Sequence, residues 1–151
     1  MRMDAGQLQA YLVKEFPQAF GPGRAHEVVR VDAGGIGLKL EAGDEHLRPG
    51  ATVSGPAMMG LADIAAYAAI LAAIGPVPLA VTTNFSINFL RKPEPGAIIA
   101  DASLLKLGQR LAVCEVGLRA PATGADPYAQ AGEEALYAHA VTTYSIPPRA
   151  I

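Results

Sequence analysis

The segment SGPAMMGLADIAAYAAILAAIG, from Ser54 to Gly75, decides the fold of this 151-residue chain. Ser54 is a favourable N-cap, and Pro56 is tolerated in a first turn, so a helix should begin here. Gly75 and Pro76 should end it. The segment lacks the charged face that a surface helix would show, so we expect other parts of the chain to enclose it on most sides.

Asp63 is the only charged residue between Ala51 and Leu90. An ionised carboxylate is costly to bury alone, so its surroundings must supply hydrogen bonds or a water-filled cleft, or favour the neutral form. In a cleft, such a carboxylate can act as general base on water or attack a carbonyl directly. A structural role is the alternative, in which Asp63 only accepts hydrogen bonds and stabilises a bend or a subunit contact.

The rest of the chain predicts a short helix and several strands. Residues 1–17 form an amphipathic pattern that Pro17 closes. Strands are expected over 26–32, 35–43, 81–92, 96–108, 110–120 and 133–146, with a Pro- and Gly-rich loop over 121–132. Tight turns pair strands antiparallel, so we expect one α+β domain over 1–151, in which a curved antiparallel sheet wraps the central helix.

Alternation along the strand over 81–92 gives it one apolar and one polar face. Val81, Thr83, Phe85, Ile87 and Phe89 should share the apolar face, and Thr82, Asn84, Ser86 and Asn88 the polar face. Such a long strand is also a candidate for the edge that pairs with a second copy of the chain, because an unprotected edge invites aggregation.

Composition argues against several classes of function. A net charge of −2 provides no electrostatic footprint for nucleic acid. Cys114 is the only cysteine and no signal-peptide pattern opens the chain, so a cytoplasmic protein is expected. The three histidines lack metal-ligand spacing, so no metal site is expected. Gly75 and Pro76 break the uncharged run, which favours a buried helix over a membrane span.

The start of the central helix is a candidate oxyanion site. Its first N–H groups have no intrahelical partner and lie at the positive end of the helix dipole. However, Gly55 and Asp63 are eight residues apart, which is ~12 Å along a helix, so one chain cannot bring both to one carbonyl. A two-fold dimer with antiparallel helices would place Gly55 of one subunit beside Asp63 of the other.

Four stretches resemble the hotdog-fold acyl-CoA thioesterases of the phenylacetic-acid-degradation (PaaI-like) type. They are RPGATVSGPAMMGLADIAAYAA (48–69), LAVTTNFSINFLRKP (79–93), KLGQRLAVCEV (106–116) and YSIPP (144–148). The resemblance covers about residues 25–148, and its most specific part is the spacing from the helix-start glycine to LAD, combined with INFLRKP. It implies a hotdog fold and hydrolysis of an acyl-CoA, with coenzyme A as part of the substrate and no other cofactor.

The resemblance also implies roles for single residues. Asp63 would activate water or attack the thioester, the Gly55 N–H would polarise the thioester carbonyl, and Thr82 would position the water. Basic residues that would meet the coenzyme A phosphates are Arg91, Lys92 and Arg110. Relatives are dimers or tetramers with the site across a subunit interface, so a homodimer, assembled further as a dimer of dimers (a homotetramer), is expected.

The chain departs from the family pattern at two places. It reads Ser54-Gly55-Pro56 where the family has His-Gly-Gly, and Arg48 stands where an asparagine is usual. Arg48 could bind a carboxylate or phosphate of the ligand, or pair with Asp63 across the interface. These departures leave open a hotdog dimer that binds an acyl-CoA or another acyl ligand without hydrolysing it.

Three apolar or aromatic residues on the helix are candidates for the acyl pocket. Met58 and Met59 could line it, although core packing would explain at least one of them. Tyr67 follows Asp63 by one turn and could border the site or hydrogen-bond the aspartate. A hydratase or dehydratase that pairs His139 with Asp63 is a less favoured alternative, as is a scaffold in which Asp63 is purely structural. The sequence does not specify the acyl group.

Overall fold

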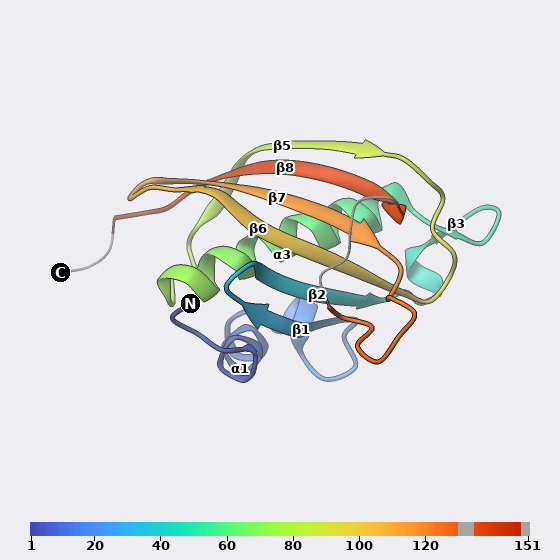
Figure 1. Ribbon diagram of the computed structural model, residues 1–151, viewed down its shortest axis with the longest axis horizontal. Helices are drawn as coiled ribbons and strands as arrows, with labels where there is room; N and C mark the ends of the chain where they lie inside the picture. The colour runs from blue at the N-terminus through green and yellow to red at the C-terminus, as the bar shows by residue number, and fades with distance from the viewer. Residues whose placement is uncertain (130–134, 149–151) are drawn as a thin grey trace.

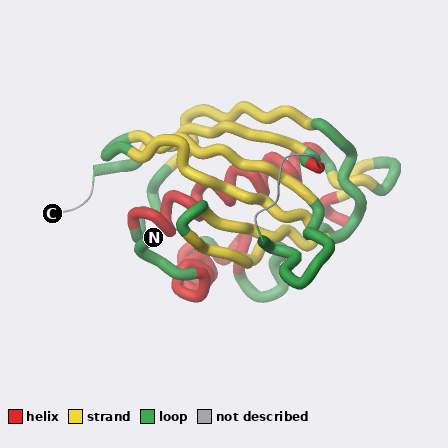
Figure 2. Tube along the Cα trace, in the orientation of Figure 1, coloured by secondary structure: helices red, strands yellow, loops and turns green. Residues whose placement is uncertain are grey.

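A six-stranded antiparallel sheet curves around one long helix in the computed structural model, which describes residues 1–129 and 135–148 (Figures 1 and 2). The sheet order is β1-β2-β6-β7-β8-β5, so β1 and β5 are its edges. Its strands are β1 (His26–Asp32), β2 (Gly35–Glu41), β5 (Val81–Phe89), β6 (Ala97–Leu107), β7 (Leu111–Arg119) and β8 (Ala138–Ser145). The short strands β3 (Leu47–Arg48) and β4 (Thr52–Val53) form a separate hairpin, which the 3-10 turn η1 (Asp44–His46) precedes. This arrangement confirms the predicted α+β fold.

The enclosed helix is α3 (Gly55–Ile74). It begins as expected, since the Ser54 side chain accepts a hydrogen bond from the Ala57 N–H at 3.2 Å. It ends at Gly75, whose φ of +88° is one that glycine adopts without strain. α3 is long and apolar enough to cross a bilayer, but here the sheet covers much of it. Full burial of a leucine or isoleucine such as Leu61 or Ile70 contributes about 1.5–3 kcal/mol.

The amphipathic helix predicted over 1–17 forms within that range, and a second short helix follows it. α1 (Ala5–Glu15) starts with a reciprocal capping box between Asp4 and Gln7, and packs Leu8 and Leu12 into the core. α1 ends at Glu15, so the first helix closes just before Pro17 as predicted, and Pro17 then opens a second helix that was not predicted, α2 (Pro17–Phe20). A proline is well tolerated at that first helical position, where its missing N–H would have no intrahelical partner.

A β-bulge in β5 changes which of its side chains share a face, so the observed faces differ from the predicted ones. Thr82 pairs with Tyr144, but Asn84 pairs with Thr143, so one extra residue is inserted in β5 at this point. Thr82 therefore shares the half-buried side of the strand, toward α3, with Phe85, which pairs with the buried Thr142. The strict alternation predicted from Val81 onward is wrong at the beginning of the strand, and Val81 itself is 57% exposed.

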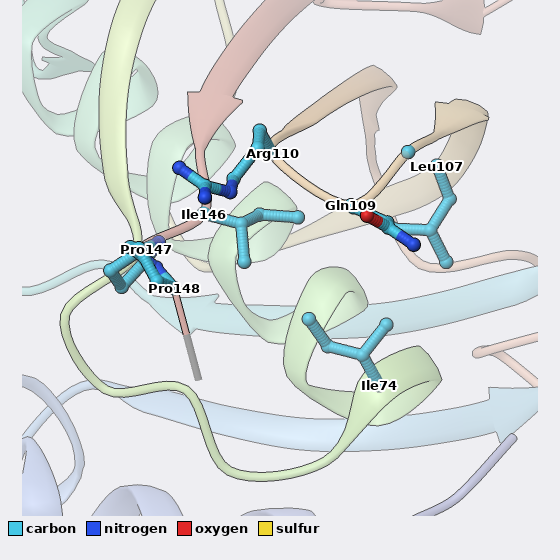
Figure 3. Close-up of a pocket in the computed structure, with 8 residues that line it drawn as sticks. Ile74, Leu107, Gln109, Arg110, Ile146, Pro147 and Pro148 are labelled. Atoms are coloured by element: carbon cyan, nitrogen blue, oxygen red, sulfur yellow. The ribbon is translucent and has the colours of Figure 1, made fainter. Parts of the chain in front are cut away.

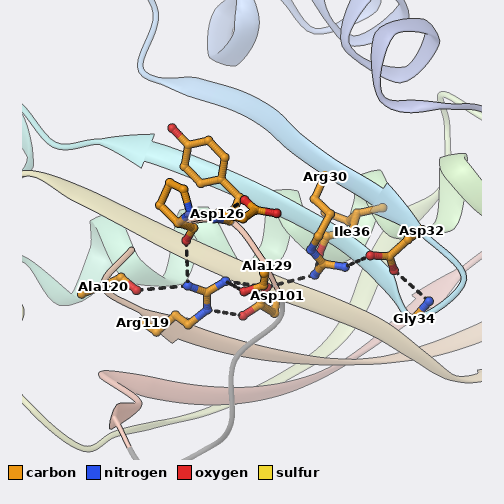
Figure 4. A network of polar contacts seen from close by, with 11 residues as sticks. Arg30, Asp32, Gly34, Ile36, Asp101, Arg119, Ala120, Asp126 and Ala129 are labelled. Atoms are coloured by element: carbon orange, nitrogen blue, oxygen red, sulfur yellow. Dashed lines mark hydrogen bonds and ion pairs between the residues drawn. The ribbon is translucent and has the colours of Figure 1, made fainter. Parts of the chain in front are cut away.

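A buried arginine fastens the loop after β7 to the face of the sheet that points away from α3 (Figure 4). Arg119, only 3% exposed, forms an ion pair with Asp101 at 2.5 Å and donates to the main-chain oxygens of Pro127 (3.2 Å) and Ala129 (2.7 Å). Arg30 reaches the other oxygen of Asp101 at 3.0 Å. Residues 130–132 of the predicted loop and 133–134 of the predicted last strand lie outside the described residues, and β8 begins at Ala138.

Candidate active site

Two hydroxyl groups hold the carboxylate of Asp63. The Thr82 hydroxyl donates to Asp63 Oδ1 at 2.7 Å, and the Tyr144 hydroxyl lies 2.8 Å from the same oxygen. The Tyr144 hydroxyl is also 2.9 Å from the main-chain oxygen of Asp63, so its proton is shared between two acceptors of one residue. Among the described residues, Asp63 Oδ2 receives no hydrogen bond. One carboxylate oxygen is thus fixed and the other is available.

Local structure explains why these three residues meet. Thr82 and Tyr144 are cross-strand partners on β5 and β8, so their side chains point to the same side of the sheet. Tyr144 follows the alternation of β8, whose buried positions include Ala140 and Thr142. The bulge keeps Thr82 on this inner side, beneath which α3 carries Asp63. The geometry depends on three elements, of which β8 lies far from α3 and β5 in the sequence.

Asp63 and Thr82 border two hollows. The smaller, about 300 Å³, is lined by Met59, Gly60, Asp63, Thr82 and Phe85, and is called the methionine hollow below. The larger, about 370 Å³, is called the tyrosine hollow; it is lined by Glu15, Phe16, Asp63, Ile64, Tyr67, Pro78, Ala80, Val81, Thr82 and Tyr144. A half-buried carboxylate open to such spaces can take a proton from a water molecule or meet an electrophilic carbon.

Tyr67 does not hydrogen-bond Asp63, although its helical position had suggested that it could. Its hydroxyl donates to the main-chain oxygen of Pro78 at 3.0 Å, and its ring stacks on Tyr144 with centroids 6.3 Å apart. Burial raises the pKa of Tyr67 to about 12 and raises the pKa of the Tyr144 phenol well above its usual range. Both phenols therefore remain protonated donors near neutral pH. Tyr67 does line the tyrosine hollow beside Asp63.

Most of the other predicted binding residues meet at the opposite end of β5. A pocket of about 440 Å³, called the cationic pocket below, is lined by Arg48, Thr52, Val53, Gly55, Met58, Phe89, Leu90, Arg91, Lys92 and Pro93. A Cβ added at Gly55 would lie 3.6 Å from the Phe89 ring, so the start of α3 adjoins the end of β5. Within one chain, this pocket and Asp63 are separate sites.

Arg110 lies away from Arg91 and Lys92. It lines a pocket of about 610 Å³ with Ile74, Leu107, Gly108, Gln109, Ile146, Pro147 and Pro148 (Figure 3). Its neighbour Leu111 pairs with Ser145, which also pairs with Val81 at the start of β5, whereas Arg91 follows the end of that strand. The three basic residues that the resemblance grouped around coenzyme A therefore occupy two different ends of the sheet in one chain.

The remaining candidates lie at the start of α3, and they differ in whether they are packed in the structure or accessible to a ligand. Ser54 uses its hydroxyl as the helix cap. Met58 is 4% exposed, so it belongs to the core while it also borders the cationic pocket. Met59 is 42% exposed and lines the methionine hollow beside Asp63.

His139 does not meet Asp63 in one protomer. Its Nε2 lies 2.8 Å from Glu115 Oε1, and both residues occupy positions between buried ones on β8 and β7, on the sheet face away from α3. This placement gives no support to a His139–Asp63 proton-transfer pair within one chain. Across residues 1–129 and 135–148, no three His, Cys, Asp or Glu side chains gather in a way that could hold a metal ion.

Sequence reasoning missed Tyr144. Its position in the alternating run AHAVTTYS predicts that it points inward, and that signal was present. That β8 lies beside β5, and that Tyr144 pairs with Thr82, is a property of the sheet order, which alternation does not reveal.

Comparison with known proteins agrees with the fold. The thioesterase superfamily model matches residues 50–124. A crystal structure of a protein from Silicibacter sp. TM1040, described as a putative thioesterase, is 43% identical, covers 97% of this chain and 93% of that one, and has a TM-score of 0.78.

Two more distant structures share the fold. The phenylacetic acid degradation protein PaaI of Thermus thermophilus, in a mutant form, is 22% identical, with 82% and 94% of the two chains covered and a TM-score of 0.63. A Streptococcus mutans protein bound to acetyl CoA is 19% identical, with 83% and 90% covered and a TM-score of 0.64. With the close match along nearly the whole chain, the conclusion is that this protein belongs to the hotdog-fold thioesterase superfamily.

Proposed function

We propose that the protein hydrolyses acyl-CoA thioesters, with Asp63 as the base on water or as the nucleophile. The observation that carries this proposal is how the Asp63 carboxylate is hydrogen-bonded and what surrounds it. Two hydroxyls hold Oδ1, Oδ2 has no partner among the described residues, and the side chain borders two hollows. A carboxylate held in this way is oriented before the substrate arrives.

The complete site is proposed to form between two protomers. Gly55 adjoins Phe89 at the end of β5, while Asp63 bonds Thr82 at its beginning, so α3 and β5 run in opposite directions. β5 is an edge strand, and Val81, Phe89 and Leu90 are each about half exposed on or beside it. If β5 pairs antiparallel with its copy, the end of one strand meets the beginning of the other, and the partner's Gly55 approaches Asp63.

The reaction then follows from these groups. As base, Asp63 takes a proton from a water molecule, whose oxygen attacks the thioester carbon. The Thr82 hydroxyl donates its hydrogen bond to Asp63 Oδ1, so its lone pairs can accept a hydrogen bond from that water. The tetrahedral oxyanion accepts a hydrogen bond from the Gly55 N–H, which has no intrahelical partner at the first helical position. The C–S bond breaks, and the coenzyme A thiolate takes up the proton that Asp63 had accepted from the water, which returns Asp63 to its carboxylate form.

Direct attack by Asp63 is the other route, and it proceeds through an acyl-carboxylate anhydride. Single turnover in ¹⁸O-labelled water can identify the anhydride route, because only that route can place the label on Asp63. Attack by water puts the label in the released acid, whereas attack of water on the aspartyl carbon of the anhydride leaves the label on Asp63, where mass spectrometry of the protein detects it.

The cationic pocket supports coenzyme A as the carrier of the acyl group. Arg48, Arg91 and Lys92 line it together with Gly55, and such cations bind phosphate oxygens well. The acetyl CoA complex of a protein with the same fold supports the same substrate class. In the proposed dimer, this pocket lies next to the partner's Asp63.

The test is thiol release across short, medium, long and aromatic acyl-CoAs, with the wild type and Asp63→Asn. Asparagine keeps the shape of the side chain but cannot accept a proton at neutral pH, so turnover should fall by about 10²–10⁴-fold. Glu115→Gln is the matched control, because Glu115 lies on the far face of the sheet. Equal hydrolysis by the wild type and Asp63→Asn would refute the assignment.

A binding protein without hydrolytic activity is the second candidate. It is favoured by Pro56, which removes one N–H from the first turn of α3, and by the use of the Ser54 hydroxyl as a helix cap. Acyl-CoA binding in calorimetry without any release of free thiol would establish this alternative.

A further inference from the structure

We propose that Tyr144 is a positioning residue for the reaction, and that its hydroxyl fixes the Asp63 carboxylate so that Oδ2 is the oxygen that reacts. This inference rests on the proposed function, because it concerns the same carboxylate. It adds a residue that neither the sequence pattern nor the family resemblance assigned.

The contacts of the Tyr144 hydroxyl restrict Asp63 at two points. The hydroxyl lies 2.8 Å from Oδ1 and 2.9 Å from the main-chain oxygen of Asp63, so it links the side chain to its own backbone. Thr82 donates to Oδ1 at 2.7 Å. With two donors on one oxygen, rotation of the carboxylate about its last bond would break both hydrogen bonds, which disfavours exchange of Oδ1 and Oδ2.

The Tyr144 ring is itself held in place. It is 3% exposed, and it stacks on Tyr67, whose own hydroxyl is tied to Pro78 at 3.0 Å. Burial raises the pKa of the Tyr144 phenol well above its usual range, so the group remains a donor throughout the working range of a thioesterase and does not compete with Asp63 as base. A rigid, permanently protonated phenol suits a positioning role.

A positioning role and a purely structural role for Tyr144 predict different effects on the kinetics. A structural hydrogen bond would change stability and leave turnover untouched. A positioning hydrogen bond should change kcat, because the orientation of Oδ2 matters in the transition state. It should leave KM nearly constant, because the Tyr144 hydroxyl is engaged by Asp63 and Tyr144 does not line the cationic pocket of its own protomer.

Tyr144→Phe removes the hydroxyl and keeps the stacked ring. We expect kcat for the best acyl-CoA to fall by about 10- to 100-fold, with KM changed by less than about 3-fold. Tyr128→Phe is the matched control, since Tyr128 lies on the loop after β7, with its ring near Lys39, and should leave both constants unchanged.

The same substitution in the Asp63→Asn background tests whether Tyr144 acts through Asp63. The residual rate of Asp63→Asn should fall no further when Tyr144→Phe is added, because the group that Tyr144 positions has already been lost. Independent, multiplying losses would overturn the inference, as would an unchanged kcat for Tyr144→Phe alongside a lowered Tm. Either result leaves the proposed function standing, provided that Asp63→Asn alone shows the loss of about 10²–10⁴-fold expected for it. Absence of thiol release by the wild type would refute both.

Discussion

At Asp63, both hydroxyl donors reach the same carboxylate oxygen. A fully buried structural aspartate would need hydrogen bonds to both oxygens, whereas the half-buried Asp63 uses one oxygen for its two donors and turns toward two hollows. From the sequence alone, a structural role and a catalytic role for Asp63 were equally possible. The second oxygen, Oδ2, has no hydrogen-bond partner within residues 1–129 and 135–148 and lies beside the two hollows, which favours a catalytic role.

The bulge in β5 leads to a prediction at the residue scale. Thr82 and Thr83 are adjacent threonines, but only Thr82 reaches Asp63, while the exposed Thr83 donates to the main-chain oxygen of Thr143 at 3.3 Å. Thr82→Val should therefore lower kcat by about 10- to 100-fold, since it removes a hydrogen bond to a charged group. Thr83→Val should leave steady-state hydrolysis of acyl-CoA unchanged. Equal effects of the two substitutions would contradict the assigned face of the strand.

At the scale of the elements, sequence patterns predicted the helix and strands well. The cap at Ser54, the stop at Gly75 and the enclosed character of α3 follow from local chemistry and an absence of charge, and the structure confirms them. The bulge in β5 and the short helix at Pro17 were missed. A bulge depends on how two strands pair, and period-two alternation within one strand carries no information about the partner.

The site was predictable only in part for the same reason. Asp63 stood out because it is the one charge in a long apolar run, and Thr82 was named only through the family resemblance. Tyr144 could be assigned to an inward face but not to Asp63, because three elements had to be placed in space first. The distance between Arg110 and Arg91 was likewise a matter of sheet order rather than of sequence.

The anchored loop after β7 gives a prediction at the element scale. Arg119→Ala leaves Asp101 with one fewer partner and releases the main-chain oxygens of Pro127 and Ala129. The free energy of unfolding should fall by about 3–5 kcal/mol, the usual cost of breaking a buried pair, as measured by urea unfolding at fixed protein concentration. Arg24→Ala, at an exposed position, is the control. A loss below about 1 kcal/mol would show that this network contributes no more than a surface ion pair.

At the scale of the whole molecule, the central claim is that the active site needs two copies of the chain. In one protomer, the N–H of Gly55 and the carboxylate of Asp63 lie beside opposite ends of β5, and the two residues line different pockets. The edge position of β5 and its exposed apolar side chains provide the surface through which two copies can meet. In such a dimer, the residues that the family resemblance assigns to one site would come together across the subunit interface.

Complementation between two inactive variants tests this claim most directly. Asp63→Asn removes the carboxylate, and Gly55→Pro removes the oxyanion N–H at a helix position that tolerates proline. A mixture of the two, unfolded and refolded together, should recover thiol release to about a quarter of the wild-type rate, because half of the dimers are mixed and one of their two sites is intact. Each variant refolded alone should remain inactive. A mixture as inactive as its components would place Gly55 and Asp63 in the same protomer's site, or in no common site, and would contradict the account.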